Sequence, residues 1–467
     1  MKKNIRILHI GSNIANNVFL NALFLREKGY IVDAISPDYD HPISTPEWEQ
    51  ANINPKKINQ ILKSQNIQNI DPVYKRPSWY LAGPLRQIAQ NKFDFQDNFS
   101  AKLIQKEYSN QRLNRLISKI NFIWIKFIRK INPYYEFITI REYLYYQSLV
   151  KKFKDLWPKR KDQLTIKDII PYISHVRIFK HIFARYDLIQ CYSTNAIVAL
   201  LANKRPYIAF EHGTIRDLPF TNSPEGRLTA LSYRLANLVF ITNNDNILAA
   251  KKLGIKNFVA IPHPIDDFWF NKLSKTIKKK NKKKIIFCPS RHDWQIKGLD
   301  LFIKAISETA KNTKIPFEVV FIRWGKEWRK SQKLIKKLNI SQYVHWEYLL
   351  TKRQLIQKML EADIILDQTI LSCMGAISPE GLRAGKPVLL SYNHNINKWA
   401  YPTPPPLIKI HSVTDASNAL IDLLNHPRRI KIIGQKSILW FNKYHSKKVI
   451  CKIEIQAYNQ LLCSKKR

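Results

Sequence analysis

The sequence alternates short apolar runs with segments of helical periodicity, and it does so in two separate series. The apolar runs of the first series cover residues 5–10, 30–36, 186–193, 205–213 and 237–244. Those of the second series are KIIFCPS (284–290), FEVVFIRWG (317–325), VHWEY (344–348), ADIILDQ (362–368) and PVLLSYN (387–393). Alternation of strands with helices is typical of parallel sheets that carry helices on both faces. The sequence therefore predicts two doubly wound α/β domains.

A lysine-rich segment separates the two series. Residues 271–284 contain eight lysines in fourteen positions, and like charges at this density favour an extended, solvated linker. We therefore expect an N-terminal domain over 1–270, interrupted by a basic and aromatic insertion over 91–180. A C-terminal domain follows over 285–440, and a final helix over 441–467 packs back on the N-terminal domain. Two doubly wound domains joined in this way imply a cleft between them.

The chain is strongly basic and poor in features of secreted proteins. Its 77 Lys and Arg against 35 Asp and Glu give a net charge of +42, which favours an anionic partner. The five cysteines form no C-x-x-C pair, which is typical of reduced thiols rather than of disulfides or zinc ligands. The N-terminus lacks the long apolar region of a signal peptide, and no apolar run approaches the roughly 18 residues of a spanning helix. We expect a cytoplasmic protein, soluble or peripheral to the membrane.

A basic pair follows the first strand of the second series, at the strand end where open parallel sheets bind ligands. Arg291 opens the segment RHDWQIKGLDLFIKAI, and Lys297 comes six residues later. Both side chains could reach a diphosphate there, the arginine as a fork and the lysine as a point charge. The alternative is a chance pair, since many loops of so basic a chain contain one.

The segment SPEGLRAGKPVLLSYN (378–393) predicts a short helix followed by a buried strand. Ser378 is a suitable N-cap, Pro379 suits the first helical position, and Gly385 is the expected left-handed residue at the helix end. Glu380 lies in the first turn. It either complements the helix dipole or pairs with the two vicinal hydroxyls of a ribose.

Four motifs, in their order and spacing, resemble retaining GT-B-fold glycosyltransferases of family 4: FEHGTIRDLPF, IPHPID, RHDWQIKGLDLFIKAI and ADIILDQTILSCMGAISPEGLRAGKPVLL. The resemblance implies two Rossmann-like domains, a nucleotide-sugar substrate and no metal or other cofactor. It implies that Arg291 and Lys297 contact the diphosphate and assist catalysis, and that Glu380 binds the ribose. The other implied donor-binding residues are Asp367, Gln368, Gly375, Ala376, Ile377 and Ser378.

The sequence departs from the family pattern in both domains. Ser372 stands eight positions before Glu380, where the family usually has a second glutamate, and Asp367-Gln368 is typical of a subset without it. In the N-terminal half, a strand end that often carries a histidine offers Tyr192 and Asn195 instead. His212 is then the candidate catalytic histidine; the alternative is a histidine bonded to loop backbone.

The first strand-to-helix loop supplies further candidates on the acceptor side. Asn13, Asn16 and Asn17 could bond acceptor hydroxyls, as could Tyr192 and Asn195, although some of these asparagines are equally suited to loop capping. Asp38-Tyr39-Asp40 resembles the metal-binding D-x-D motif of the other glycosyltransferase fold. It lies beyond the second strand, away from the donor motifs, so we expect no metal.

Within the insertion, residues 111–132 place apolar and basic side chains in separate arcs of a helical wheel, apart from Phe122. Such a helix lies in an anionic membrane interface or docks as an ordinary surface helix. With the basic charge, it favours a lipid-linked or cell-envelope saccharide acceptor, such as a lipopolysaccharide precursor, at the inner face of the membrane. Rival interpretations are a nucleic-acid-binding protein, a GT-B-fold epimerase and a phosphorylase. No nucleic-acid motif stands out, and no acid/base pair or cofactor lysine can be assigned.

Overall fold

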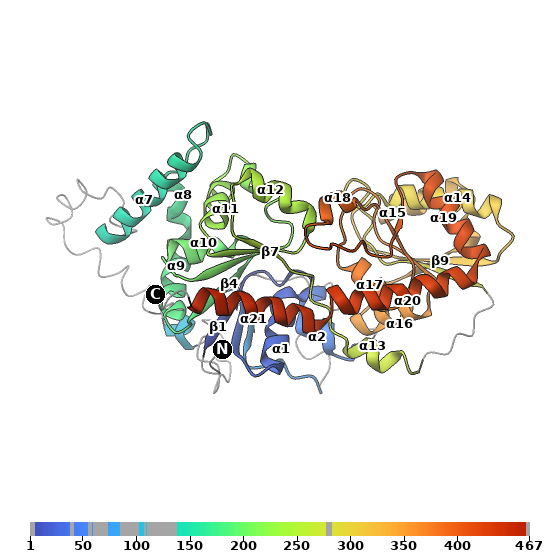
Figure 1. Cartoon of the computed structure of the whole chain (residues 1–467), viewed down its shortest axis with the longest axis horizontal. Helices are drawn as coiled ribbons and strands as arrows, with labels where there is room; N and C mark the ends of the chain where they lie inside the picture. Colours follow the sequence, from blue (N-terminus) through green and yellow to red (C-terminus); the bar gives the residue numbers. More distant parts are fainter. Residues whose placement is uncertain are drawn as a thin grey trace.

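The computed structural model describes residues 5–37, 42–54, 58, 73–84, 102–106, 109, 138–276 and 283–463. It contains two sheets whose neighbouring strands pair in parallel, one in each half of the chain (Figure 1). The N-terminal sheet has the order β3-β2-β1-β4-β5-β6-β7. Its strands are β1 (Arg6–Ile10), β2 (Ile31–Ser36), β3 (Tyr80–Ala82), β4 (Leu188–Tyr192), β5 (Tyr207–Glu211), β6 (Leu238–Ile241) and β7 (Phe258–Ala260).

The C-terminal sheet has the order β10-β9-β8-β11-β12-β13. Its strands are β8 (Lys284–Cys288), β9 (Phe317–Ile322), β10 (Val344–Glu347), β11 (Ile364–Leu366), β12 (Val388–Leu390) and β13 (Ile408–Lys409). Every strand expected from the apolar runs is present. The three that were not expected, β3, β7 and β13, are edge strands of two or three residues. Length alone does not explain this, because β11 and β12 also have three residues; those two are fully buried, whereas β7 and β13 are partly exposed at the sheet edges.

Each sheet has an apolar core on both of its faces, because successive strand residues point to opposite sides. In β5, Ile208 and Phe210 join one core and Ala209 joins the other. Helices α1 (Asn17–Glu27) and α21 (Lys447–Cys463) cover the first face of the N-terminal sheet. The second face is covered by α9 (Ile173–Phe183), α10 (Ala196–Leu201) and α11 (Pro224–Arg234).

The C-terminal sheet is covered in the same way. One face packs against α13 (Phe268–Leu273), α16 (Lys352–Glu361), α17 (Ile377–Arg383) and the end of α20 (Pro427–Tyr444). The other packs against α14 (Leu299–Asn312), α15 (Trp328–Lys337) and α19 (Val413–Asn425). The remaining α-helices among the described residues are α2 (Pro46–Gln50), α7 (Ile140–Leu156), α8 (Ile166–Ile169), α12 (Ile247–Lys252) and α18 (His394–Asn397). This arrangement confirms the predicted fold class, with two doubly wound α/β domains.

The expected boundaries differ from the structure near the linker. Residues 268–273 form α13, although the N-terminal domain was expected to reach 270 and an extended linker to begin at 271. The reason is an apolar face: Trp269, Phe270 and Leu273 are buried in the C-terminal core. Only residues 277–282 of the expected linker lie outside the described ranges.

The last two helices connect the domains. Figure 1 shows α20 beside the C-terminal sheet and α21 continuing along the N-terminal one. Tyr458 of α21 is fully buried, and its hydroxyl donates to Gln190 Oε1 at 2.8 Å. Glu454 accepts from Gln190 Nε2 at 3.0 Å, and burial raises its pKa to about 8. The chain therefore returns to the N-terminal domain through its final helix.

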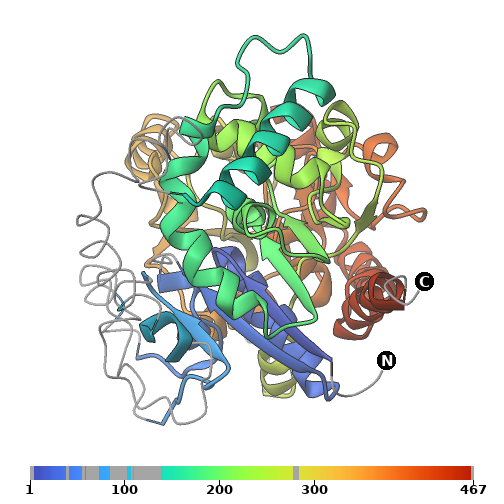
Figure 2. The same ribbon diagram turned by 90° about the vertical axis from the view of Figure 1, so that its left-hand side faces the viewer.

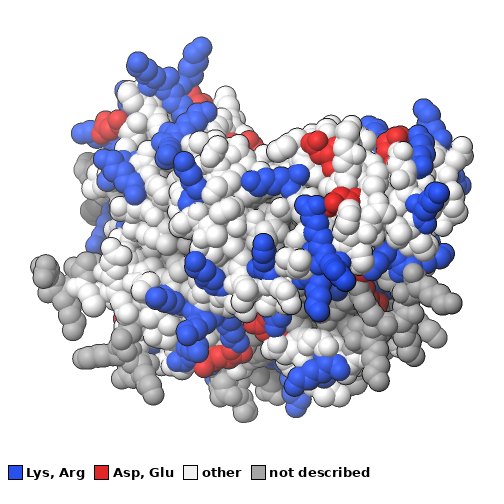
Figure 3. Space-filling view, turned by 45° about the vertical axis from the view of Figure 1, so that its right-hand side comes forward, with Lys and Arg blue, Asp and Glu red and all other residues white. Residues whose placement is uncertain are grey.

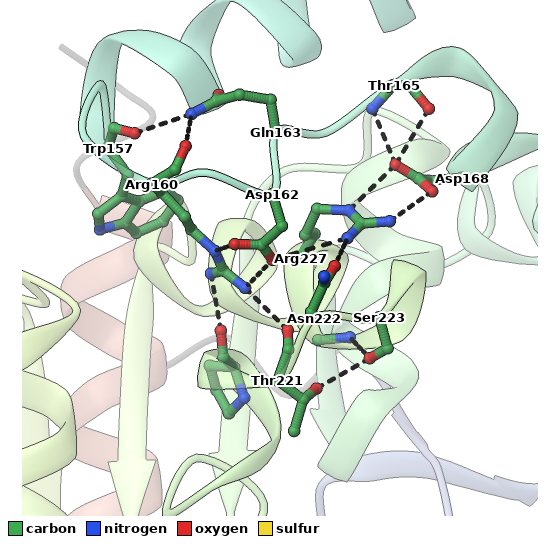
Figure 4. A network of polar contacts seen from close by, with 12 residues as sticks. Trp157, Arg160, Asp162, Gln163, Thr165, Asp168, Thr221, Asn222, Ser223 and Arg227 are labelled. Carbon is green, nitrogen blue, oxygen red and sulfur yellow. Dashed lines mark hydrogen bonds and ion pairs between the residues drawn. The ribbon is translucent and has the colours of Figure 1, made fainter.

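The described part of the insertion is helical, with α7, α8 and α9 at the end of the molecule remote from the C-terminal domain (Figure 2). Two partly buried arginines fix it to α11 and to the segment before that helix, because Arg160 donates to the Pro219 and Thr221 carbonyls and Arg227 of α11 pairs with Asp168 (Figure 4). Arg160 forms a fork with Asp162 at 2.9 and 2.8 Å, and Arg227 forms one with Asp168 at 3.1 and 2.8 Å. The amphipathic segment 111–132 lies outside the described residues.

Figure 3 shows lysine and arginine side chains spread over both domains on the visible face, rather than gathered in one groove. Among the described helices, none is long and apolar enough to cross a bilayer.

Candidate active site

Asp367, at the carboxyl end of β11, organises the donor-side residues. Its carboxylate is fully buried and accepts hydrogen bonds from Ser290 Oγ at 3.0 Å and from Ser378 Oγ. Lys297 Nζ lies 3.7 Å from Asp367 Oδ1 and donates to Gln368 Oε1. One buried carboxylate therefore ties the ends of two adjacent strands to the first turn of α17.

Ser378 was expected to be the N-cap of that helix, and this expectation is wrong. The helix begins at Ile377, with Ala376 as its N-cap and no side-chain capping bond. The Ser378 hydroxyl instead donates a hydrogen bond to the Asp367 carboxylate, which the fold places beside it. Gly385 does adopt the left-handed conformation at the helix end, with φ +68°.

The backbone that carries Lys297 is held by the loop after β11. Thr369 donates from its N–H to the Lys297 carbonyl at 2.9 Å and from its hydroxyl to the Gly298 carbonyl at 3.0 Å. Gly298 has φ +64°, and a Cβ there would stand 1.9 Å from Thr369 Oγ1. At Gly375, a Cβ would stand 3.5 Å from Lys297 Nζ. The close approach of Thr369 therefore requires glycine at position 298, whereas a Cβ at position 375 would only make ordinary contact with the lysine.

Arg291 differs from Lys297 in its surroundings. Its side chain is 47% exposed and lies 3.8 Å from Asp293, whereas that of Lys297 is 18% exposed. The structure therefore gathers Lys297, Asp367, Gln368, Gly375 and Ser378 into one cluster and leaves Arg291 at its edge.

Glu380 has a partner that the sequence did not suggest. Its carboxylate is buried, and Lys352 Nζ lies 2.6 Å from Oε1. The same amine lies 3.5 Å from Glu49 Oε2 in α2 of the N-terminal domain. Glu49 also accepts from Asn16 Nδ2 at 3.0 Å. Glu380 is thus part of a chain of polar contacts that crosses from one domain to the other.

Burial and neighbouring charges shift the pKa values of Glu49 and Lys352 in this chain of contacts. It raises the pKa of Glu49 to about 7, although the positive charge of Lys352 opposes the shift. Burial alone would lower the pKa of Lys352, but the carboxylates of Glu380 and Glu49 raise it above its ordinary value. No motif identified Glu49 or Lys352, because their pairing depends on how the domains pack.

His212 follows β5 in the N-terminal sheet, directly after Glu211. Among the described residues, neither of its buried ring nitrogens has a hydrogen-bond partner, so the backbone-bonded alternative is wrong. Its ring packs edge-on to Tyr192 and Phe210, with centroids 6.3 and 6.4 Å apart. Burial, with a smaller contribution from His263, lowers its pKa to about 3. Burial raises the pKa of Glu211 to about 7.

His263, in the IPHPID segment after β7, is hydrogen-bonded through Nε2 to Asn243 Oδ1 at 3.2 Å. Burial, with a smaller contribution from the charge of Lys297 in the other domain, lowers its pKa to about 4. Arg216 pairs with Asp245 at 2.9 Å, and both influence the pKa of Cys373 in the loop beside Lys297. The carboxyl ends of the two sheets therefore face each other.

The acceptor-side asparagines bond to the protein itself, Asn17 within its own loop and Asn13 and Asn16 to the segment 43–49. Asn13 donates to the Ser44 carbonyl at 2.7 Å, and Asn17 donates to the Ile14 carbonyl at 2.7 Å. All three asparagines, including Asn16, are buried, which favours the capping alternative. Asn195 is 8% exposed at the end of β4.

Tyr192 is not placed to meet an acceptor. Its side chain is fully buried, and its hydroxyl contacts His9, Asn21 and Gln190 at 2.7–3.1 Å. This strand residue points into the core beneath α1, where it supports the sheet.

The described residues contain no group of three or more His, Cys, Asp or Glu side chains that could hold a metal ion. Asp38-Tyr39-Asp40 lies outside them.

Comparisons with known proteins agree with this geometry. Residues 270–438 match the family of glycosyl transferases group 1. The fold resembles that of sucrose-phosphate synthase from Thermosynechococcus elongatus, with a TM-score of 0.57 and 13% identity over 99% of this chain and 100% of that one. No curated protein matches the chain by sequence.

Two further structures contain nucleotide. S. aureus TarM, in complex with Fondaparinux, alpha-GlcNAc-glycerol and UDP, has a TM-score of 0.54 at 11% identity, covering 98% of this chain and 99% of that one. Anabaena HepE, in complex with UDP and glucose, has a TM-score of 0.51 at 15% identity, covering 64% of this chain and 83% of that one. The C-terminal domain is therefore a group 1 glycosyltransferase domain, and the protein is a glycosyltransferase with the GT-B fold.

Proposed function

We propose that the protein transfers a sugar, with retention, from a nucleotide-diphosphate sugar to a lipid-linked or cell-envelope saccharide. The observation that carries the proposal is the Lys297 amine, held 3.7 Å from Asp367 where the ends of β8 and β11 meet the opposing domain. Arg291 lies at the edge of the same cluster. Two cations at this position suit a diphosphate, whose charge increases as it leaves the sugar.

In the proposed reaction, the bond between the anomeric carbon and the diphosphate oxygen breaks. A bond from the acceptor oxygen forms on the same face of the sugar, and the departing diphosphate takes the acceptor's proton. No strong protein base is needed. His212 fits this scheme, because a pKa lowered to about 3 makes its neutral ring a weak base that orients a hydroxyl.

Glu380 is proposed to bind the ribose of the donor while it keeps its pairing with Lys352. UDP is the first nucleotide to test, because the HepE and TarM structures contain UDP. The acceptor assignment is supported by the net charge of +42, which would attract an anionic membrane surface. The protein would then work at the cytoplasmic face of the membrane, bound peripherally.

A nucleotide screen tests the donor assignment. A bound nucleotide raises the melting temperature in proportion to the logarithm of its concentration over Kd. We expect UDP, GDP or ADP to stabilise the chain, and the matching nucleotide sugar to yield a product whose anomeric configuration, read by NMR, equals that of the donor.

Vesicles with anionic lipid should pellet the protein and neutral vesicles should not. An inverted product contradicts retention, and salt-sensitive binding to RNA without nucleotide binding would favour the nucleic-acid alternative.

A further inference from the structure

A pocket of about 570 Å³ opens in the C-terminal domain beyond the carboxyl ends of β12 and β13. Its walls include Ser372, Tyr392, His394, Asn395, Lys409 and His411. These two strands are neighbours, with Leu390 paired to Lys409. The segment after β12 and the end of β13 therefore converge on one space.

The side chains around this pocket are hydrogen-bond donors. They comprise a lysine, two histidines, a phenol, a hydroxyl and amides, and none of the described residues in its walls is acidic. Asp415, the nearby acid on the first turn of α19, is engaged by the backbone N–H of His411 at 3.0 Å. Such a lining suits an oxyanion, which accepts several hydrogen bonds at once.

Two residues that line the pocket each carry a buried polar atom without a hydrogen-bond partner. Tyr392 is only 2% exposed, and among the described residues its hydroxyl has no hydrogen-bond partner. His394 Nδ1 is likewise buried without one. A buried donor left unpaired costs about 1–3 kcal/mol, so an orphaned phenol on a residue that lines a polar pocket favours a ligand there. Burial raises the pKa of Tyr392, which keeps the phenol protonated as a donor.

The pocket adjoins the candidate active site. The Ser372 carbonyl accepts from Asn393 N–H at 3.3 Å and from Asn397 Nδ2 at 2.9 Å, which joins the pocket wall to the loop beside Lys297. On its other side, Trp399 donates to the Asn244 carbonyl of the N-terminal domain at 3.0 Å. A group bound here would belong to a substrate lying near the junction of the domains.

We propose that this pocket binds a carboxylate or phosphate group carried by a saccharide substrate, with Tyr392 and Lys409 as its main ligands. The assignment of the anion to a saccharide rests on the proposed function; the oxyanion site itself rests on the pocket.

The test is titration of the full chain with glucuronate, glucose 6-phosphate and neutral glucose, followed by NMR. To exclude binding at the diphosphate site, the titration uses the Arg291→Ala/Lys297→Ala variant. We expect one or both anions to bind and glucose not to bind, and the two anions distinguish a carboxylate from a phosphate ligand. Lys409→Gln and Tyr392→Phe should each weaken binding about tenfold. Lys311→Gln, on the exposed face of α14, is the matched control.

Binding of neither anion overturns the proposal, as does an affinity that Lys409→Gln leaves unchanged. Because Lys409 is exposed, its substitution keeps the fold, and circular dichroism checks Tyr392→Phe. Anion binding that depends on Lys409 in a protein without transferase activity would retain the site and reject the proposed function. Sugar transfer by a protein that binds neither anion would retain the proposed function and reject the oxyanion site.

Discussion

Charged side chains line the carboxyl edge of the C-terminal sheet, whereas burial keeps the histidines at the same edge of the N-terminal sheet neutral. On the C-terminal side, Lys297 stands 3.7 Å from Asp367, and Arg291 is half exposed beside them. On the N-terminal side, burial lowers the pKa of His212 to about 3 and that of His263 to about 4. Under the proposed function this difference divides the work: the C-terminal edge would balance the charge of the diphosphate, and the histidines of the N-terminal edge would orient acceptor hydroxyls.

The largest effect is expected on the charged edge. Lys297→Ala removes the cation held by Asp367, and we expect kcat to fall about 100- to 1,000-fold, as for loss of a group that stabilises developing charge. Arg291→Ala should cost less, because that side chain is largely solvated. Steady-state kinetics measure both, with Lys304→Ala on the exposed face of α14 as control. An equal loss of kcat in Lys304→Ala would mean that the overall positive charge of the protein, rather than Lys297 at this site, supports the reaction.

A smaller effect is expected on the neutral edge. His212→Asn should lower kcat about tenfold or more while leaving nucleotide affinity unchanged, since orientation of the acceptor, not donor binding, is removed. Because the folded-state pKa lies below the ordinary 6.5, the buried neutral ring costs stability as pH falls from about 6.5 toward 3, and the variant should lose that part of the acid sensitivity. Weakened UDP binding in the variant would contradict the division between the two edges.

The smallest effect on turnover is expected at Lys352, whose ion pairs with Glu49 and Glu380 join the two domains. Lys352→Met leaves the carboxylates of Glu49 and Glu380 buried without their cation, which should lower the free energy of unfolding by about 3 kcal/mol. Nucleotide affinity should fall less than tenfold. Chemical denaturation and calorimetry measure the two quantities. Adding Glu49→Gln should restore part of the stability, because one of the two like charges is then gone.

If Lys352→Met changes neither stability nor nucleotide affinity, this ion pair does not couple the domains. If it abolishes nucleotide binding, Glu380 depends on Lys352 for its position in the donor site.

Local features of the sequence were sufficient for much of the fold. Apolar runs marked the central strands of both sheets, because a strand buried on both faces must be apolar throughout. Gly385 was recognised as a helix end, because a left-handed residue there favours glycine whatever surrounds it. The position of Lys297 after β8 also followed from chain order, since parallel strands present their carboxyl ends at one edge.

Other features depended on residues far apart in the chain. Ser378 was read as a cap, but it bonds Asp367, because strand β11 lies against the start of α17. Helix α13 belongs to the C-terminal domain because its apolar side chains pack into the core of that domain. The short edge strands form where a neighbouring strand offers unpaired backbone groups, which no local pattern reveals.

The sequence by itself determined the two α/β series, their order and the basic pair at the first strand end of the second series. Only the tertiary structure decided which side chains meet: Lys352 with Glu49 and Glu380, and Ser378 with Asp367. The physical reason is that periodicity and turn chemistry act within a few residues. Ion pairing and the loss of solvent that shifts a pKa depend instead on how two domains pack.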